Sequence, residues 1–229
     1  MELTKDIELT LTEQAFRKIR HAIIACEINP GHKLKVEELS QQYQISSSPV
    51  REALTRLSET GFVESLDNKG FRSSMLTIEG IQELTQVRLL IETHALVDAI
   101  AHGDDQWEAN VVANAHALSL IERKITDSNL ALNDEWSTRH RTFHLSIYEG
   151  SPSKLIKGIL VNLFDNGDRY RKFSALHRTV NRKKNNEHQQ ILKAVIDRDT
   201  EAAVELLKTH IQATESLVIQ GLTNLNKAH

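Results

Sequence analysis

Apolar residues recur with helical spacing along most of this chain. In the segment ISSSPVREALTRL, residues 45–57, apolar positions repeat at i, i+3, i+4 and i+7, which predicts a short amphipathic helix with one buried face. Ser48 is the expected N-cap, and Pro49 then occupies the first helical position, where a missing N–H group has no cost. Arg51 and Thr55 lie on the opposite face. A helix of this size, with a basic and hydroxyl-rich outer face, fits the DNA major groove.

The segments around this helix predict a compact unit. Two helices are expected before it, at about residues 12–28 and 36–43, and a short turn separates the second of them from the capped helix. After Gly61, which can end that helix, short strand-like segments at residues 62–65 and 71–74 flank a turn, as in a β-hairpin. A helix-turn-helix followed by a hairpin is a winged helix-turn-helix.

From Thr77 onward the apolar spacing is helical throughout. Helices are expected at residues 78–102, 105–125, 128–149, 153–174, 178–198 and 200–220. Their short connections favour an antiparallel bundle. The sequence therefore predicts a mainly α fold, with an N-terminal winged helix-turn-helix and a C-terminal antiparallel all-α bundle of six to seven helices. The expected divisions are a flexible arm (1–10), the winged unit (11–76), the bundle (77–222) and a frayed tail (223–229).

Composition narrows the classes of protein that remain. With 40% hydrophobic residues, 26% charged residues and three prolines, the chain has the composition of a helical globular protein, and no apolar run is long enough to span a membrane. The N-terminus lacks a signal-peptide pattern and Cys26 is the single cysteine, so a cytoplasmic protein is expected. The net charge of −3 does not favour nucleic-acid binding. Any DNA contact must depend on where individual basic residues stand.

Four histidines lie on the apolar faces of three expected bundle helices: His140, His144, His188 and His210. His140 and His144 are four residues apart, which places their rings on consecutive helical turns, a common arrangement for two metal ligands. One such histidine is usually a core residue with one hydrogen bond, but several buried imidazoles are unfavourable unless something binds them. Spacing alone leaves a metal site and an ordinary histidine-containing core both open. Glu187, beside His188, is expected to face elsewhere because consecutive helical residues diverge by about 100°.

Arginines in the bundle indicate a candidate anion site. Arg171 continues the apolar face of the helix expected at residues 153–174, whereas Arg169 is expected to point outward. An arginine directed into a bundle needs an anion. The anion is either a bound ligand or an internal acid, and the spacing does not distinguish them.

The segment LSQQYQISSSPVREALTRLSETGFVESLDNKGFRSS resembles the DNA-binding domain of the GntR family of bacterial transcription regulators, over about residues 11–76. The resemblance implies that Arg51 contacts double-stranded DNA from the recognition helix. It also implies a set of neighbouring DNA-binding positions at the N-terminal end of that helix and at the wing tip near the minor groove: Ser46, Ser47, Ser48, Pro49, Lys69 and Gly70. Arg51 is equally placed for a surface pair with Glu52 or Glu59, and the serines for capping alone. Relatives often have arginine where this chain has Glu37 and Ser47, so a different operator is expected.

The segments RHRTFH, EHQQILKAVIDRDTEAAVELLKTHI and VRLLIETHALVDAIA resemble the C-terminal ligand-binding (FCD) domain of the FadR-type branch of this family, over about residues 80–220. Metal-binding members of that branch use one carboxylate and three histidines. The resemblance implies that His140 replaces the carboxylate and that His144, His188 and His210 are the other ligands. Because all four ligands are imidazoles, zinc is favoured over manganese or magnesium, and nickel, cobalt or copper are also compatible.

The same resemblance places Arg88 near a small-molecule effector, together with Arg171, although Arg88 can equally form an exposed pair with Glu92. The segment DEWSTRHRTFH further resembles carbon-starvation-induced regulators, whose effectors are dicarboxylate-like. We therefore expect a homodimeric regulator, in the simplest case a repressor, whose operator affinity responds to a small carboxylate in a metal-containing bundle. The alternatives are a regulator with a purely structural metal and a metal-dependent hydrolase, although the HExxH, P-loop and nucleophile-elbow motifs are absent.

Overall fold

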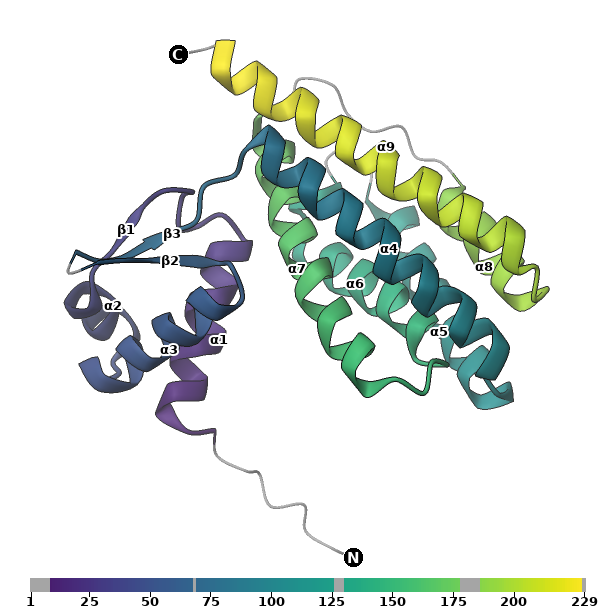
Figure 1. The fold of residues 1–229 in the computed structure, drawn as a ribbon, viewed down its shortest axis with the longest axis horizontal. Helices are drawn as coiled ribbons and strands as arrows, with labels where there is room; N and C mark the ends of the chain where they lie inside the picture. The colour runs from purple at the N-terminus through teal and green to yellow at the C-terminus, as the bar shows by residue number, and fades with distance from the viewer. Residues whose placement is uncertain (1–8, 68, 126–129, 178–185, 228–229) are drawn as a thin grey trace, which may run out of the picture. The chain divides into compact units, whose positions relative to one another are not determined.

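The computed structural model describes residues 9–67, 69–125, 130–177 and 186–227, and the chain divides into two compact units, Met1–Leu76 and Thr77–His229. Each unit has its own hydrophobic core. Figure 1 shows helices and a small sheet in the first unit and helices alone in the second. Most of the arm expected at residues 1–10 lies outside the described residues, but Thr10 is the N-cap of the first helix and accepts a hydrogen bond from the backbone N–H of Glu13.

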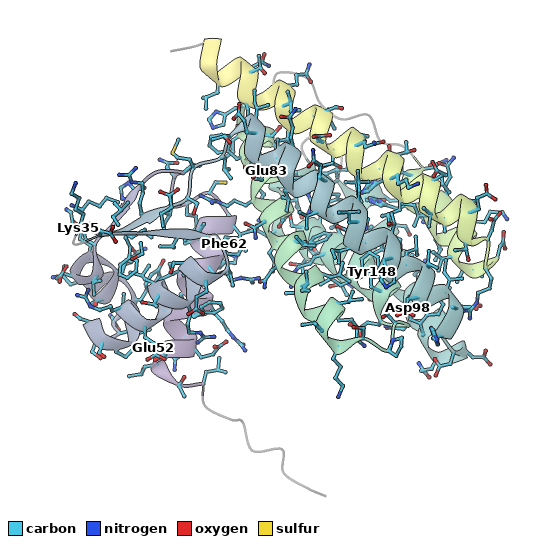
Figure 2. The ribbon with its side chains drawn as sticks, viewed as in Figure 1. Lys35, Glu52, Phe62, Glu83, Asp98 and Tyr148 are labelled. Carbon is cyan, nitrogen blue, oxygen red and sulfur yellow. The ribbon has the colours of Figure 1, made fainter. Side chains whose placement is uncertain are left out.

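The first unit has the elements of a winged helix-turn-helix: α1 (Leu11–Ile24), β1 (Lys33–Leu34), α2 (Val36–Tyr43), α3 (Ser47–Glu59), β2 (Val63–Leu66) and β3 (Gly70–Ser73). The apolar face predicted for the third helix is confirmed, because Val50, Leu54 and Leu57 are fully buried. Phe62, labelled in Figure 2, is also fully buried and belongs to the same core. Removing these side chains from water is the main stabilising contribution in so small a unit.

The third helix starts earlier than the sequence pattern indicates. Its N-cap is Ser46 and not Ser48, so Pro49 is the third helical residue. Proline is tolerated there because the first N–H groups of a helix have no acceptor within the helix. Gln44 ends α2 in the left-handed conformation, with φ 56°, and this sharp turn separates the two helices. Ser46 makes no side-chain capping hydrogen bond, so capping alone does not account for this serine.

The sheet contains a strand that the sequence analysis missed. Within the described residues it is three-stranded and antiparallel, in the order β1-β3-β2. Strand β1 pairs Lys33 with Arg72 and Leu34 with Phe71, and β2 pairs Glu64 with Arg72. Because β1 has only two residues, it is too short to show an alternating pattern.

The second unit is built from α4 (Ile78–His102), α5 (Asp105–Lys124), the 3-10 helix η1 (Leu130–Leu132), α6 (Asp134–Tyr148), α7 (Lys154–His177), α8 (Glu187–Ile196) and α9 (Thr200–Lys227). The predicted mainly α fold is confirmed. Helices α6 and α8 begin later than expected, and residues 126–129 and 178–185 lie outside the described ranges. Helix α9 continues to Lys227, beyond residue 220, where the last helix was expected to end. Val218 and Leu222 explain the extension, because they prolong its buried face.

Neighbouring helices in this unit position the side chains discussed below. Helix α4 packs against α6, α7 and α9, while α5 packs against α6 and α8 (Figure 1). The Trp107 indole N–H on α5 donates to the backbone oxygens of Ser146 and Ile147 on α6. None of the helices in the part of the chain that the structure describes is both long and apolar enough to cross a membrane.

Candidate metal centre and DNA-binding surface

The structure brings together the four histidines that the sequence pattern singled out. His140 and His144 lie on α6, His188 on α8 and His210 on α9, and one ring nitrogen from each lies within 4.8 Å of those of the other three. His140, His144 and His210 are at most 2% exposed, and the side chain of His188 is 11% exposed. Four imidazoles from three helices therefore converge inside the bundle.

Aromatic rings enclose the histidine cluster. Trp136, one turn before His140, stacks on its ring with centroids 4.4 Å apart and an interplanar angle of 22°. The rings of Phe143 and Phe164 lie with their centroids 5.2 and 5.6 Å from that of His144. These neighbours supply packing but no lone pairs, so the imidazoles are the available metal donors on this side of the cluster.

Burial favours the neutral form of the two histidines on α6. It lowers the pKa of both His140 and His144 well below the ordinary value, and the nearby positive charge of Arg171 and the neighbouring histidines add to this effect. Neutral imidazole is the form that binds a metal ion. The Nδ1 atoms of His140 and His144 and the Nε2 atom of His188 are buried without a hydrogen-bond partner. The protein alone thus leaves part of this cluster unsatisfied.

The donor spacing fits a shared metal ion. The Nε2 atoms of His140 and His144 are 3.1 Å apart. Two nitrogens bound to one zinc ion at about 2.0–2.1 Å in a tetrahedron are about 3.3 Å apart. The same distance also suits a hydrogen bond between the two rings, but that bond gives no partner to Nε2 of His188.

Two carboxylates contact the outer ring nitrogens of the cluster. Glu187 Oε2 lies 2.8 Å from Nδ1 of His210, and Glu122 Oε1 on α5 lies 3.3 Å from Nδ1 of His188. A protonated Nδ1 that donates to a carboxylate leaves Nε2 as a lone-pair donor, which is the usual support for a metal-bound histidine. Trp136 also donates its indole N–H to Glu122 at 3.2 Å.

The prediction that Glu187 faces elsewhere was wrong. Glu187 does diverge from the adjacent His188, but the histidine that it contacts, His210, belongs to the next helix. Glu122 was missed altogether, since it is far from His188 in the sequence and no spacing rule connects them. Only the packing of α5 against α8 identifies it.

Arg88 is in a different environment from the one expected. Its pair with Glu92 forms, with Nε 2.5 Å from Oε1, but it is buried rather than exposed: Arg88 is 3% and Glu92 1% accessible. Tyr148, labelled in Figure 2, donates its hydroxyl to the other oxygen of Glu92 at 2.7 Å. The expected surface pair is internal because α6 and α7 cover this side of α4.

Arg171 is buried as expected, and its internal acid is Asp168, one turn earlier. A guanidinium nitrogen of Arg171 lies 2.9 Å from Asp168 Oδ1, and the guanidinium also lies 4.7 Å from the centre of the Phe164 ring. The prediction that Arg169 points outward was wrong, because Arg169 is only 2% exposed.

The error for Arg169 has a structural reason. Within the second unit, Tyr170 contacts the start of α4, Lys172 contacts Asp134 on α6, and Ser174 donates to a backbone oxygen of α9. The second half of α7 therefore has neighbours on several sides. An amphipathic pattern predicts one buried face and fails for a helix that is enclosed in this way.

The expected DNA-binding residues lie on the surface of the first unit. Ser46, Ser47, Ser48 and Arg51 are exposed and Pro49 is half-buried. Arg51 makes no ion pair with any residue that the structure describes, and Glu52, one of its expected partners, instead accepts a hydrogen bond from Thr12 at 3.1 Å. The guanidinium of Arg51 is thus available at the start of the recognition helix.

The wing residues are exposed as well. Lys69 and Gly70 lie where the turn after β2 meets β3. Gly70 has φ 88°, a left-handed conformation that glycine adopts without strain. A Cβ atom at Gly70 would meet no atom within 4 Å, so the backbone conformation and not crowding accounts for glycine here.

Comparisons with known proteins agree with this architecture. The family described as "Bacterial regulatory proteins, gntR family" matches residues 11–72, and the FCD domain matches residues 83–213. The transcriptional repressor GlaR of Escherichia coli (strain K12) is 33% identical over 220 residues, covering 93% of this chain and 99% of the relative. The transcriptional regulator BphR of Paraburkholderia xenovorans (strain LB400) is 30% identical, covering 92% and 86%.

A solved structure shows the same fold at lower identity. Escherichia coli McbR/YncC superposes with a TM-score of 0.76 and 21% identity, over 93% of this chain and 99% of that one. The sequence relatives are transcription regulators and not enzymes, which confirms that the hydrolase alternative does not apply. The chain belongs to the GntR family of bacterial transcription regulators, with an N-terminal GntR DNA-binding domain and a C-terminal FCD domain.

Proposed function

We propose that this protein is a homodimeric transcriptional repressor whose operator affinity responds to a small carboxylate, bound beside a divalent metal ion in the helical domain. The observation that carries this proposal is the convergence of four imidazoles, His140, His144, His188 and His210, among which Nε2 of His188 is buried without a partner. The repressor sense is supported by a relative that is named as a repressor.

In this proposal the four histidines hold the metal through neutral ring nitrogens. Zinc is the first choice, with nickel or cobalt as alternatives, because an all-nitrogen donor set disfavours magnesium and manganese. Glu122 and Glu187 are not ligands but orient His188 and His210 and offset the charge of a buried dication. When bound, the metal supplies a fixed positive charge that attracts a carboxylate.

The effector binds beside the cluster and contacts Arg171. Support comes from the position of Arg171: its guanidinium lies 4.7 Å from the centre of the Phe164 ring, and that ring lies 5.6 Å from the rings of both His140 and His144. Arg171 already has an anionic partner, Asp168, so an incoming carboxylate either shares the guanidinium with that acid or displaces it. Arg88 is held by Glu92 and contributes positive charge to the wall of the site rather than a free guanidinium.

DNA binding is assigned to the winged unit. Arg51 reads base edges in the major groove, while the first turn of α3, with Ser46, Ser47, Ser48 and Pro49, approaches the DNA backbone. Lys69 and Gly70 reach the adjacent minor groove. One short recognition helix covers one half-site, so two chains are needed for a palindromic operator.

A second copy of the chain is supported by the surface of α4. Val87, Leu90 and Val97 are exposed, and Leu90 is 72% accessible. With His94 and Ala101 they repeat at alternating steps of three and four residues, the spacing of a helix that packs along another helix. We assign this stripe to the contact between two copies related by two-fold symmetry.

The alternative of a purely structural metal is favoured by the number of protein ligands. Four protein ligands complete the tetrahedral shell of zinc, as in structural zinc sites, and leave no position for an effector on the metal. In that case the metal stabilises the bundle and DNA binding does not respond to a carboxylate.

A thermal-shift experiment distinguishes the two functions. The protein is loaded with zinc, nickel, cobalt or no metal, and each form is mixed with small mono- and dicarboxylates or with the corresponding amides, which have the same shape without the charge. We expect an acid, but not its amide, to raise the melting temperature of the metal-loaded protein, because a ligand of the folded state stabilises it by mass action. Metal-dependent stabilisation without any response to an acid would identify the metal as purely structural.

A further inference from the structure

The wing sheet carries a cationic pocket that is separate from the recognition helix. Lys33 on β1, Lys69 at the turn and Arg72 on β3 line a pocket of about 430 Å³ together with Leu66. Phe71 and Ser73, on either side of Arg72, face the core, so Arg72 lies on the outer face of the sheet. Three cationic side chains are therefore gathered on one outer surface.

The register of the sheet makes this arrangement unfavourable for stability. Lys33 and Arg72 are directly opposite each other in the antiparallel β1–β3 pair. Like charges at directly opposed positions destabilise a sheet. Glu64 is opposite Arg72 on the other side, but it is outside the pocket lining and forms no ion pair with Arg72 in the described structure. Folding alone does not explain why these cations are placed together.

Several other cations of the same unit contact a carboxylate of that unit. Lys35 contacts Glu38 at 2.5 Å, and Arg17 and Arg56 both contact Glu13. Over the part of the unit that the structure describes, Lys33, Lys69 and Arg72 form no such pair. Their positive charge is therefore available to an external anion.

We propose that Lys33, Lys69 and Arg72 form a binding site for a phosphodiester of the DNA backbone. This inference rests on the proposed DNA binding and adds Lys33 and Arg72 to its contacts. The guanidinium of Arg72 can bind two phosphate oxygens at once, and the two lysines add point charges around it. Because Lys33 and Arg72 stand on paired strands and not on the turn, the site is rigid and fixes how the wing meets the duplex.

The salt dependence of DNA binding tests this site. Binding of a fluorescent random-sequence duplex is measured by anisotropy at several salt concentrations, for the full chain and for the Lys33→Gln/Arg72→Gln double variant. Each lost phosphate contact reduces the slope of log K against log salt concentration by about 0.9. We expect the double variant to have a slope that is smaller by roughly one to two units for each bound chain. Glutamine keeps most of the side-chain length, and circular dichroism verifies the fold.

The matched control is Lys35→Gln, which removes a nearby cation that Glu38 already compensates. This control should keep the slope of the unchanged protein. A double variant with an unchanged slope, while the parent protein binds the duplex, would overturn the phosphodiester site and leave the proposed function intact. A parent protein that binds no duplex at all would overturn both.

A second experiment distinguishes a site for the DNA backbone from a site for a small free anion. Inorganic phosphate is compared with chloride at equal sodium concentration as a competitor of duplex binding. We expect the two salts to compete equally. Binding of the site to the DNA backbone releases counterions from the DNA, and this release depends on the salt concentration and not on free phosphate. Stronger competition by inorganic phosphate that disappears in the double variant, while the parent protein and the double variant have the same salt slope, would identify a site for a small anion and would overturn the DNA assignment.

Discussion

The two units of this protein use their cationic side chains in opposite ways. In the first unit, Arg51 and Lys33 are exposed and have no ion pair with any described residue. In the second unit, Arg88 and Arg171 are buried and each contacts a carboxylate. A charge in a protein interior needs a partner, whereas a charge in water does not. The exposed cations can therefore bind a polyanion directly, while a ligand of the bundle meets arginines that already contact an internal acid.

The units also differ in how many elements build each site. The DNA contacts predicted from the sequence come from one helix and one hairpin, and only Lys33, on β1, depends on a further strand. The histidine cluster takes ligands from α6, α8 and α9 and supporting carboxylates from α5 and α8. A ligand of this cluster therefore contacts several helices at once, and it can shift their arrangement only if it binds one arrangement more tightly than another. The proposed DNA contacts therefore depend on few elements, and the proposed metal site depends on four helices.

The largest expected effect is the loss of the metal from the bundle. The His144→Ala/His188→Ala double variant removes ligands from two helices, so we expect its metal content to fall from about one ion per chain to none. The measurement is elemental analysis of purified protein after dialysis against zinc.

His116→Ala is the control for this experiment, because His116 is exposed on α5, outside the cluster. Its metal content should equal that of the parent protein. If the parent protein neither contains nor takes up a metal, the histidine cluster is not a metal-binding site.

The next largest expected effect concerns operator binding by the winged unit. Arg51→Ala should weaken binding to a selected operator by about 1–3 kcal/mol for each half-site, because a bidentate arginine–guanine contact is lost. Anisotropy with an operator selected from a random duplex pool measures this change.

Arg17→Ala is the matched control, since Arg17 is an exposed arginine of the same unit that contacts Glu13. Unchanged operator affinity of Arg51→Ala would remove the assignment of this side chain to base reading. Equal losses for both variants would indicate a general effect of charge.

The smallest expected effect concerns the contact between Glu187 and Nδ1 of His210 in the histidine cluster. Glu187→Gln keeps an oxygen that can accept from Nδ1 of His210 but removes the negative charge. We expect metal affinity to fall by about tenfold, the lower end of the range for outer-sphere substitutions. Competition with a chelator of known affinity gives the ratio.

Glu201→Gln is its control, because Glu201 is exposed in the first turn of α9 and does not contact the cluster. The two variants should differ in metal affinity and not in melting temperature without metal. Equal metal affinities would show that Glu187 has no role in positioning His210.

The sequence by itself determined the elements and several members of each site. Helical spacing predicted the winged unit and the bundle, because periodicity reports the buried face of a helix that has one main neighbour. It also placed His140, His144, His188 and His210 on inward faces, since the register of a helix is a local property. Arg51 could be identified in the same way, as an outer-face residue of a helix whose inner face is apolar.

Tertiary structure decided which groups meet. Glu122 and Glu187 contact histidines of other helices, and the two-residue strand β1 exists only through its pairing with β3. Arg169 is buried because α7 has neighbours on several sides, which an amphipathic pattern does not encode. The partners of the buried arginines and the clustering of Lys33 with Arg72 likewise depend on which elements lie side by side. Contacts between elements distant in sequence are set by packing of the whole chain, and local periodicity carries no information about them.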